Sequence, residues 1–288
     1  MTVEPGPDAD VAYCVEQLRE SDRDRYLSLL LAPADARAAL SALYAFRLEV
    51  AKTHAVVSEP MLGQIRLQWW RESIDGLFAG TPRRHAVLTP LAGAVRERGL
   101  PRAPFDAVID AHERDLDLAP FPDSESLERY CTEVEGSIVA LAFAILGGPV
   151  EGARLALAQE AGRAIGMAGL LRRLAPGRRS GPLAIPAAVA SAQGLDPDDL
   201  RRVSLDDGRM RASVEAVAGL ARRRLSAARA LRRAAGPRDC AALLPLTSAG
   251  GLLRRLSAAR FHAADPRVVE PAPGEMWRLA LASLLRRF

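Results

Sequence analysis

Carboxylate side chains gather in one short stretch of the sequence, at Asp106, Asp110, Glu113, Asp115 and Asp117. On a continuous helix, positions 106, 110, 113 and 117 would share one face, because residues three and four apart are neighbours there. Such a face offers the oxygen ligands that a hard cation prefers. A solvated acidic face beside Arg114 requires no cation, and it is the interpretation that we favour.

Glycine and alanine recur at positions 162, 164, 166, 168 and 169. Residues this small would let a helix pack closely on a neighbouring element or on a ligand. The next turn carries Arg172 and Arg173. It therefore offers positive charge and no carboxylate ligand to a metal ion.

Familiar hydrolytic and nucleotide-binding patterns are missing. The sequence contains no G-x-S-x-G elbow, no H-E-x-x-H helix and no G-x-x-x-x-G-K-[ST] loop. The four histidines are isolated in sequence, so each is expected to be a surface or capping residue rather than a base or a ligand: His54, His85, His112 and His262. The pair Trp69-Trp70 is predicted to anchor one ring of a helix in the core.

The elements that must position these residues are predicted to be helices. The chain has 288 residues, 49% of them hydrophobic, which suffices for one large core. Leu, Ala and Arg dominate while β-branched and aromatic residues are few, which favours an all-α fold. Proline and glycine divide the chain into expected helices near 10–31, 34–56, 60–79, 84–98, 103–118, 124–146, 151–174, 197–203, 208–235, 239–262 and 273–287. No repeat or low-complexity linker occurs, so we expect a single domain over 1–288 with a flexible N-terminus at 1–9.

Charge is unevenly distributed. Residues 1–150 hold 15 Lys and Arg against 23 Asp and Glu, whereas residues 151–288 hold 24 against 12. A basic half suggests an anionic partner such as a diphosphate, a lipid headgroup or nucleic acid, although a solvated arginine-rich surface explains it equally well. The basic face of 208–235 could lie on anionic lipid, but a solvated face is the commoner case. No nucleic-acid motif and no interleaving of aromatics with arginine is present, so we expect no nucleic-acid partner.

Cysteine usage and the termini bear on the compartment. Cys14, Cys131 and Cys240 are widely spaced with no CxxC pair, which fits a reducing compartment. The acidic, proline-containing N-terminus is unlike a signal or transit peptide. No apolar run reaches the roughly 18–20 residues that span a bilayer. We expect a cytoplasmic protein, at most peripheral to a membrane.

Taken in order, several short motifs resemble the squalene and phytoene synthase family of prenyltransferases. Each motif is weak alone, but their order and spacing together are specific and run over nearly the whole chain. They are Tyr44-Ala45-Phe46, Leu67-x-Trp69-Trp70-Arg71 with Asp75, Gly99-Leu100-Pro101 before Phe105, Asp115-Leu116-Asp117, Tyr130-Cys131 with Gly136-Ser137, Gly162-x-Ala164, and Gly181 to Pro186.

The resemblance implies an isoprenoid-synthase-type helical bundle around a central cavity. In working members, two aspartate-rich helices hold Mg²⁺ on the substrate diphosphates and stabilise the leaving group. Carried over by position, the first motif falls on Ala51, Lys52 and Ala55, and the second on Arg173 and Gly177. All five acidic positions are lost, and a fixed positive charge at 52 or 173 raises the cost of placing Mg²⁺ nearby.

A closer likeness is to the branch of this family that serves in assembly of mitochondrial respiratory complex I. It rests on the stretch 45–52, on Val57-Ser58-Glu59, and on Ile65-Arg66-Leu67-Gln68-Trp69-Trp70. The likeness implies a non-catalytic assembly factor for complex I (NADH dehydrogenase), in a bacterial relative of that branch. Its partners would be complex I subunits or assembly intermediates, with contact at the inner face of the inner membrane.

The remaining cavity is expected to bind an isoprenoid, a quinone or an anionic lipid without any metal cofactor. The residues predicted to hold such a ligand are Lys52, Arg172, Arg173, Arg178, Arg179 and Tyr44. The alternative function is an active synthase that condenses prenyl diphosphates head to head. That alternative requires Mg²⁺ on substitute ligands, for which Glu49, Asp110 and Asp115 are the candidates.

Overall fold

The computed structural model describes residues 7–57, 59–175, 181–285 and 287–288. In these ranges the regular elements are helices and no strand occurs, which confirms the all-α prediction. The α-helices are α1 (Pro7–Ser21), α2 (Arg23–Leu30), α3 (Arg37–Ala51), α4 (Thr53–Val56), α5 (Pro60–Phe78), α6 (Leu88–Arg98), α7 (Ala103–Ala111), α8 (Ser124–Cys131), α9 (Ser137–Gly147), α10 (Gly152–Arg172), α11 (Ala187–Ala192), α12 (Gly208–Ala230), α13 (Cys240–Ala258), α14 (Pro266–Val269) and α15 (Glu275–Leu285). Short 3-10 helices cover Ala34–Ala36, His112–Leu116, Pro197–Asp199 and Arg232–Ala234, and a π-helix over Thr132–Gly136 joins α8 to α9.

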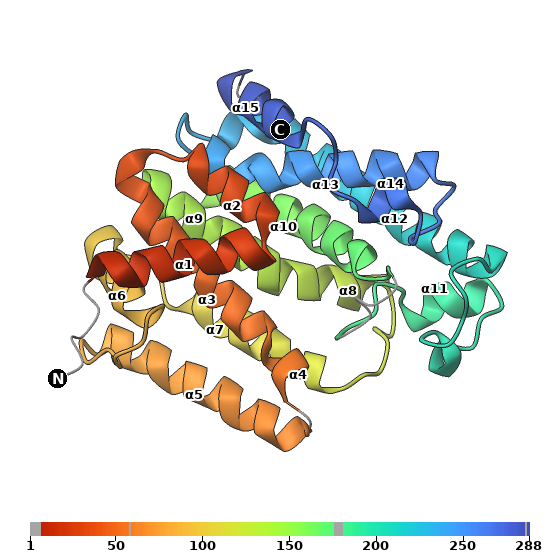
Figure 1. Cartoon of the computed structure of the whole chain (residues 1–288), viewed down its shortest axis with the longest axis horizontal. Coiled ribbons are helices and arrows are strands. Elements are labelled where there is room, and N and C mark those ends of the chain that lie inside the picture. The colour runs from red at the N-terminus through yellow and green to blue at the C-terminus, as the bar shows by residue number, and fades with distance from the viewer. Residues whose placement is uncertain (1–6, 58, 176–180, 286) are drawn as a thin grey trace.

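Helix α10 runs through the middle of the bundle. It packs against α12 and α13 on one side and against α8, the π-helix and α9 on another (Figure 1). Helices α3 and α7 pack against α9, and α5 lies outside them at the lower edge of the view. Most residues of α10 between Leu157 and Leu171 are therefore buried.

Small residues let α10 approach the π-helix closely. A Cβ atom on Gly162 would lie 2.2 Å from the nitrogen of Gly136, and one on Gly166 would lie 2.8 Å from Sγ of Cys131. No side chain fits in either place. At Gly162 and Gly166 the small residues thus allow close packing on a neighbouring element, whereas Gly169 has open space where its Cβ atom would be.

The expected helix over 10–31 is two helices. Asp22 breaks it with φ −140° and ψ 72°, and its side chain accepts a hydrogen bond from the backbone nitrogen of Arg25 to begin α2. A short polar side chain at this place competes with the helical backbone, which explains the break. At the other end, α1 begins at Pro7, inside the stretch expected to be flexible, while residues 1–6 lie outside the described ranges.

The acidic stretch does not form the single helical face that we expected. Helix α7 ends at Ala111 and a 3-10 helix follows as far as Leu116, where the backbone becomes extended at Asp117. A 3-10 helix turns more tightly than an α-helix, so positions 106, 110, 113 and 117 do not stay in line. The acidic side chains therefore do not share one face, either as a solvated surface or as a site for a cation.

The tryptophan pair behaves as predicted. Trp70 is 1% exposed and its ring meets that of Phe46 edge to face at 5.5 Å between centroids. Trp69 is only partly buried and covers the core from outside. One ring of the pair therefore anchors α5.

One continuous helical stretch, Ser124–Gly147, has the length and mean hydropathy of a membrane span. Of its most apolar window, 67% is buried inside the protein. Its second half, α9, packs on α3, α7, α10 and α13. The stretch is the core helix of the bundle, since the same apolar surface cannot face both the core and lipid.

Candidate functional site

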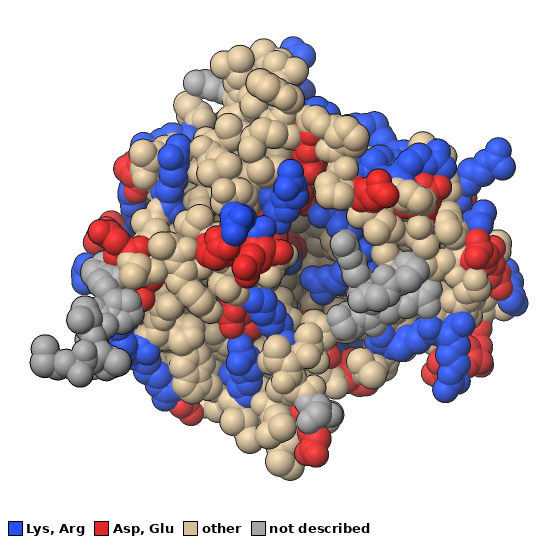
Figure 2. Space-filling model, viewed as in Figure 1, with Lys and Arg blue, Asp and Glu red and all other residues tan. Residues whose placement is uncertain are grey.

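A cavity of about 590 Å³ opens between the start of α2, the carboxyl end of α10 and α13. The hollow at the centre of the face in Figure 2 has acidic and basic residues at its rim. Six arginines and six carboxylate residues line the cavity, together with an apolar wall from Ile165, Ala249 and Val268. Which of these charges pair with one another decides what the cavity can hold.

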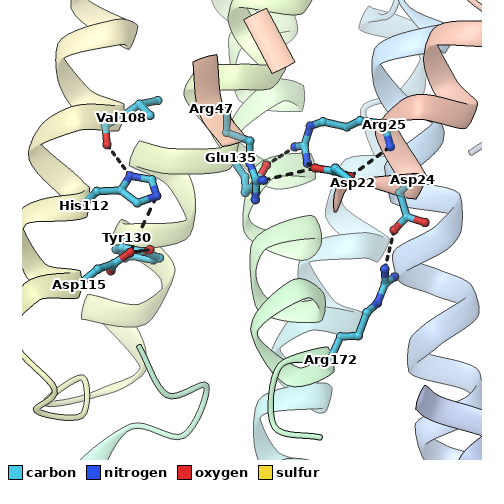
Figure 3. Close-up of polar contacts among 10 residues, drawn as sticks. All are labelled: Asp22, Asp24, Arg25, Arg47, Val108, His112, Asp115, Tyr130, Glu135 and Arg172. Atoms are coloured by element: carbon cyan, nitrogen blue, oxygen red, sulfur yellow. Dashed lines mark hydrogen bonds and ion pairs between the residues drawn. The ribbon is translucent and has the colours of Figure 1, made fainter. Parts of the chain in front are cut away.

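Four of the charged residues form a closed, buried network (Figure 3). Arg25 donates to Asp22 at 2.9 Å and pairs with Glu135. Arg47 donates through Nε to Glu135 at 2.9 Å and reaches Asp22 at 3.3 Å. Each guanidinium thus contacts both carboxylates, and the network carries no net charge.

Burial and pairing oppose one another at Glu135. Burial by itself raises the pKa of a carboxyl group, but Arg25 and Arg47 outweigh it and hold the pKa of Glu135 at about 2. Burial also acts to raise the pKa of Asp22, and the same two guanidiniums lower it overall. Both carboxylates are therefore ionised at neutral pH, and they join α2, α3 and the π-helix.

Two residues predicted to bind an anion are already neutralised by protein carboxylates. Lys52 donates to Gln17 at 2.8 Å and lies 3.3 Å from Glu49. Arg172 pairs with Asp24 at 2.9 Å (Figure 3). These pairs tie α3 to α1 and α10 to α2, so neither cation is free to act as the primary clamp that we expected.

Arg173 and Arg255 differ from these two. The side chain of Arg173 makes no hydrogen bond or ion pair within the described ranges, yet it lines the cavity and, after burial, acts to lower the pKa of His54. Nε and Nη1 of Arg255 are buried without a hydrogen-bond partner, and burial lowers the pKa of this guanidinium. Buried donors without acceptors are uncommon in folded proteins, so the cavity offers unmet donors to an anion.

A second cluster of buried polar residues lies around Asp115. The hydroxyl of Tyr130 donates to Oδ2 of Asp115 at 2.9 Å, and Nε2 of His112 lies 3.9 Å from the same oxygen (Figure 3). Nδ1 of His112 donates to the carbonyl of Val108 at 2.7 Å. Burial raises the pKa of Asp115 to about 7 and lowers that of His112 to about 4. His112 is thus a neutral core residue and not the surface or capping histidine that we predicted.

The substitute metal ligands of the alternative function have separate partners. Glu49 pairs with Lys52 and with Arg66, and exposed Asp110 pairs with Arg71 at 2.8 Å. Asp115 is held by Tyr130. Among the described residues, no group of three or more His, Cys, Asp or Glu side chains is placed to hold a metal ion.

The other predicted site residues fall in different surroundings. Tyr44 is 2% exposed, with the guanidinium of Arg25 5.4 Å from its ring centre, and burial raises its pKa to about 12. Its hydroxyl is therefore part of the core. Ala51 ends α3, and Ala55 lies on α4. Gly177, Arg178 and Arg179 lie outside the described residues.

Sequence reasoning missed the residues that contribute most to the polar interior, which are Asp22, Arg25, Arg47, Glu135 and Arg255. A signal was present for two of them. Arg47 and Glu135 each interrupt a run of apolar and small residues that periodicity assigns to the core. A charged residue at such a position needs a partner of opposite sign, so the two could have been matched by type.

The family model described as squalene/phytoene synthase matches residues 18–273. The NADH dehydrogenase (ubiquinone) complex I assembly factor 6 of Bos taurus is 30% identical over 254 residues, covering 88% of this chain and 76% of that protein. The presqualene diphosphate synthase of Rhodopseudomonas palustris is 32% identical over 141 residues, covering 49% of this chain and 50% of the other. A dehydrosqualene synthase crystal structure superposes with a TM-score of 0.83 at 15% identity, covering 97% of both chains, and confirms the expected fold.

Proposed function

Because the chain belongs to the squalene/phytoene synthase family, we propose that it is a non-catalytic member that serves in the assembly of respiratory complex I, the NADH dehydrogenase. The similarity to an assembly factor supports this proposal over most of the chain, whereas the similarity to a presqualene diphosphate synthase covers about half of it. Complex I subunits or assembly intermediates would be the partners. We propose no metal cofactor and no nucleic-acid partner.

The observation that carries the proposal is the side chain of Arg173 at the cavity. The family resemblance places a metal-binding carboxylate at this position, and at that of Lys52. A guanidinium without a carboxylate partner among the described residues repels Mg²⁺ and attracts an anion. The cavity is therefore better suited to holding an anionic group directly than to ionising a diphosphate through metal ions.

The ligand we propose is an amphiphile with an anionic or polar head, such as an isoprenoid, a quinone or an anionic lipid. Arg173 and Arg255 would meet the head, and the wall of Ile165, Ala249 and Val268 would meet the chain. Lys52 and Arg172 would take part only by exchanging their present carboxylates for the ligand. Arg178 and Arg179 stay predictions. The protein would act in the cytoplasm and at the inner face of the inner membrane.

The assembly role is tested by deleting the gene in the organism that encodes the protein. The expected result is loss of assembled complex I on native gels of membranes, and of NADH-dependent quinone reduction, with rescue by the wild-type gene. Other respiratory complexes on the same gel serve as the control. Intact complex I in the deletion strain would contradict the proposal.

The alternative function, an active synthase with substitute metal ligands, is favoured by the partial similarity to a presqualene diphosphate synthase. A turnover assay with prenyl diphosphates, Mg²⁺ and a reductant separates the two functions. We expect no diphosphate release from the wild type or from Arg173→Asp, while an authentic synthase turns over in the same assay. Condensation by the wild type would establish the alternative.

Ligand binding is tested separately by thermal shift with farnesyl diphosphate, a soluble quinone and a short-chain anionic phospholipid, without metal. At least one should raise the melting temperature of the wild type and fail to do so with Arg173→Gln and Arg255→Gln. Arg96→Gln, an exposed arginine on α6, is the matched control. A shift that survives in both cavity variants would place the ligand elsewhere.

A further inference from the structure

Helix α15 leaves an apolar face uncovered at the outer edge of the bundle. Its inner face, with Leu279 and Ala282 buried, packs on α2 and α13. Opposite that face, Trp277 is 80% exposed and Leu284 is 79% exposed. Leu281 and Leu285 are exposed beside them, and the spacing of 277, 281, 284 and 285 sets them on one side of the helix. We refer to these four residues as the α15 face.

Helix α15 lies at the upper edge of the molecule in Figure 1, and the same place in Figure 2 is covered mainly by uncharged residues. Single exposed apolar residues are ordinary on protein surfaces. A contiguous set that includes tryptophan and leucines on one helix is different, because it marks a surface that meets a partner.

Three arginines, Arg229, Arg254 and Arg278, lie close together beside α13 and α15. A Cβ atom on Gly250 of α13 would lie 3.3 Å from Nη2 of Arg229 and 3.8 Å from Nη1 of Arg254. A Cβ atom on Gly251 would lie 3.8 Å from Nη1 of Arg278 and 3.9 Å from Nη2 of Arg254. Arg254 therefore lies between Arg229 of α12 and Arg278 of α15.

No side-chain carboxylate within the described ranges forms an ion pair with these three arginines. Arg229 donates to the main-chain oxygen of Phe288, and burial together with the nearby Arg254 lowers its pKa. Most other arginines around the bundle have carboxylate partners, as Arg224 has in Glu128. The charges of Arg254 and Arg278 are thus left for an external anion, whereas Arg229 already donates to Phe288.

We infer that the α15 face and the arginines at 229, 254 and 278 together form a docking surface for an anionic phospholipid membrane. Trp277 and the leucines would enter the boundary between headgroups and acyl chains, where tryptophan is favoured. The arginines would meet lipid phosphates, and Arg278 is placed for this because it lies on the flank of the same helix.

The length of α15 specifies how it would lie. Its 11 residues reach about 16 Å, roughly half of a hydrocarbon core, so it cannot span a bilayer. With its inner face held by α2 and α13, it can only lie in the plane of the surface. An apolar protein partner would satisfy the leucines but would leave Arg254 and Arg278 without an anion, and for that reason we commit to lipid. This surface lies apart from the cavity, and the inference holds whether or not the protein acts in complex I assembly.

The test uses the purified full-length protein and vesicles of phosphatidylcholine with or without phosphatidylglycerol, in a flotation assay. The wild type should float with the anionic vesicles and much less with the neutral ones, and salt should weaken this difference. Trp277→Ser combined with Leu284→Ser should lower the partition coefficient by about tenfold or more, since two apolar side chains no longer leave water. Arg254→Gln combined with Arg278→Gln should abolish the preference for anionic vesicles.

The matched control is Met61→Ser combined with Ile65→Ser on α5, where both residues are also exposed, at the opposite edge of the molecule. It should float like the wild type. Circular dichroism establishes that each variant is folded, and the arginine pair tests the surface without altering the apolar residues. Equal flotation of the α15 variants and the wild type would overturn the inference. Failure of the wild type to float would also overturn the inference, whether or not the wild type forms a dimer that the α15 variants dissociate.

Discussion

The hydroxyl of Tyr130 donates a hydrogen bond of 2.9 Å to Oδ2 of Asp115, and both residues are buried. The other carboxylate oxygen, Oδ1, is buried without a partner. Because burial raises the pKa of Asp115 to about 7, this carboxyl group is a mixture of its acid and its anion near neutral pH. Tyr130 and the nearby arginines are what keep the pKa from rising further.

The first prediction concerns this bond. Tyr130→Phe should lower the free energy of unfolding by about 1–3 kcal/mol at pH 7, because the buried Oδ2 of Asp115 loses its donor. The measurement is urea denaturation followed by circular dichroism. Tyr13→Phe is the control, since Tyr13 is 40% exposed and no hydrogen bond holds its hydroxyl within the described residues, and it should change nothing measurable. Equal stability of Tyr130→Phe and the wild type would mean that water already satisfies Asp115.

The second prediction is a pH dependence in which two neighbours oppose each other. The pKa of Asp115 is raised from 3.8 to about 7, so its contribution to stability falls as pH rises through that range. The pKa of His112 is lowered from 6.5 to about 4, so its contribution rises with pH between those values. In the wild type the two trends cancel in part.

Single variants should separate the trends. In Asp115→Asn the free energy of unfolding should rise more steeply between pH 4 and pH 6.5 than in the wild type, because His112 then titrates without the opposing trend of Asp115. In His112→Gln it should fall between pH 4 and pH 7, by at most about 4 kcal/mol at about 1.4 kcal/mol per pKa unit. Denaturation curves across this range give both slopes. Parallel slopes in the two variants would refute the assignment.

The third prediction concerns the buried network. Glu135→Gln should lower the free energy of unfolding by about 3–5 kcal/mol, because Arg25 and Arg47 stay buried with their shared carboxylate removed. The exposed pair of Arg83 and Glu72 is the comparison, and Glu72→Gln should leave stability unchanged. In the wild type, the contribution of Glu135 should be complete above about pH 4.5 and be lost as pH falls toward 2. An unaltered acid transition in Glu135→Gln would count against this.

The fourth prediction compares two glycines of α10. Gly162→Ala should destabilise the protein by about 1–3 kcal/mol, because the new Cβ meets the backbone of Gly136. Gly169→Ala should be neutral or stabilise by up to about 1 kcal/mol, because the helix gains a better helix former and nothing lies within 4 Å. Thermal melts of the two variants suffice. The reverse order would mean that α10 does not contact the π-helix as described.

Several features of the fold were predictable because their causes are local. Helix α5 was expected at 60–79 and covers Pro60–Phe78, with proline at its first turn. A helix was expected to end near residue 146, and α9 ends at Gly147 with Gly148 at φ 80°. Local rules failed at the π-helix and at the 3-10 helix after α7. Their backbone depends on what packs against them, as Gly162 packs against Gly136.

The candidate site was only partly predictable. The family resemblance placed Lys52 and Arg173 at positions of lost carboxylates and added Arg172 as a ligand-binding residue, and the structure separates the three by their partners. Glu49 and Gln17 hold Lys52, Asp24 holds Arg172, and Arg173 has no side-chain partner in the described ranges. A sequence states the charge of each residue but not which opposite charge is nearest.

The sequence by itself determined the all-α class, most helix positions and the family, because propensity, capping and ordered motifs act over a few residues at a time. Only the tertiary structure decided that Arg47 meets Glu135, 88 residues away, and that Trp277 faces outward. Pairing and burial are set by the packing of distant segments, such as the close approach of Gly162 to Gly136. That packing as a whole determines which charges are neutralised and which remain available to a ligand or a membrane.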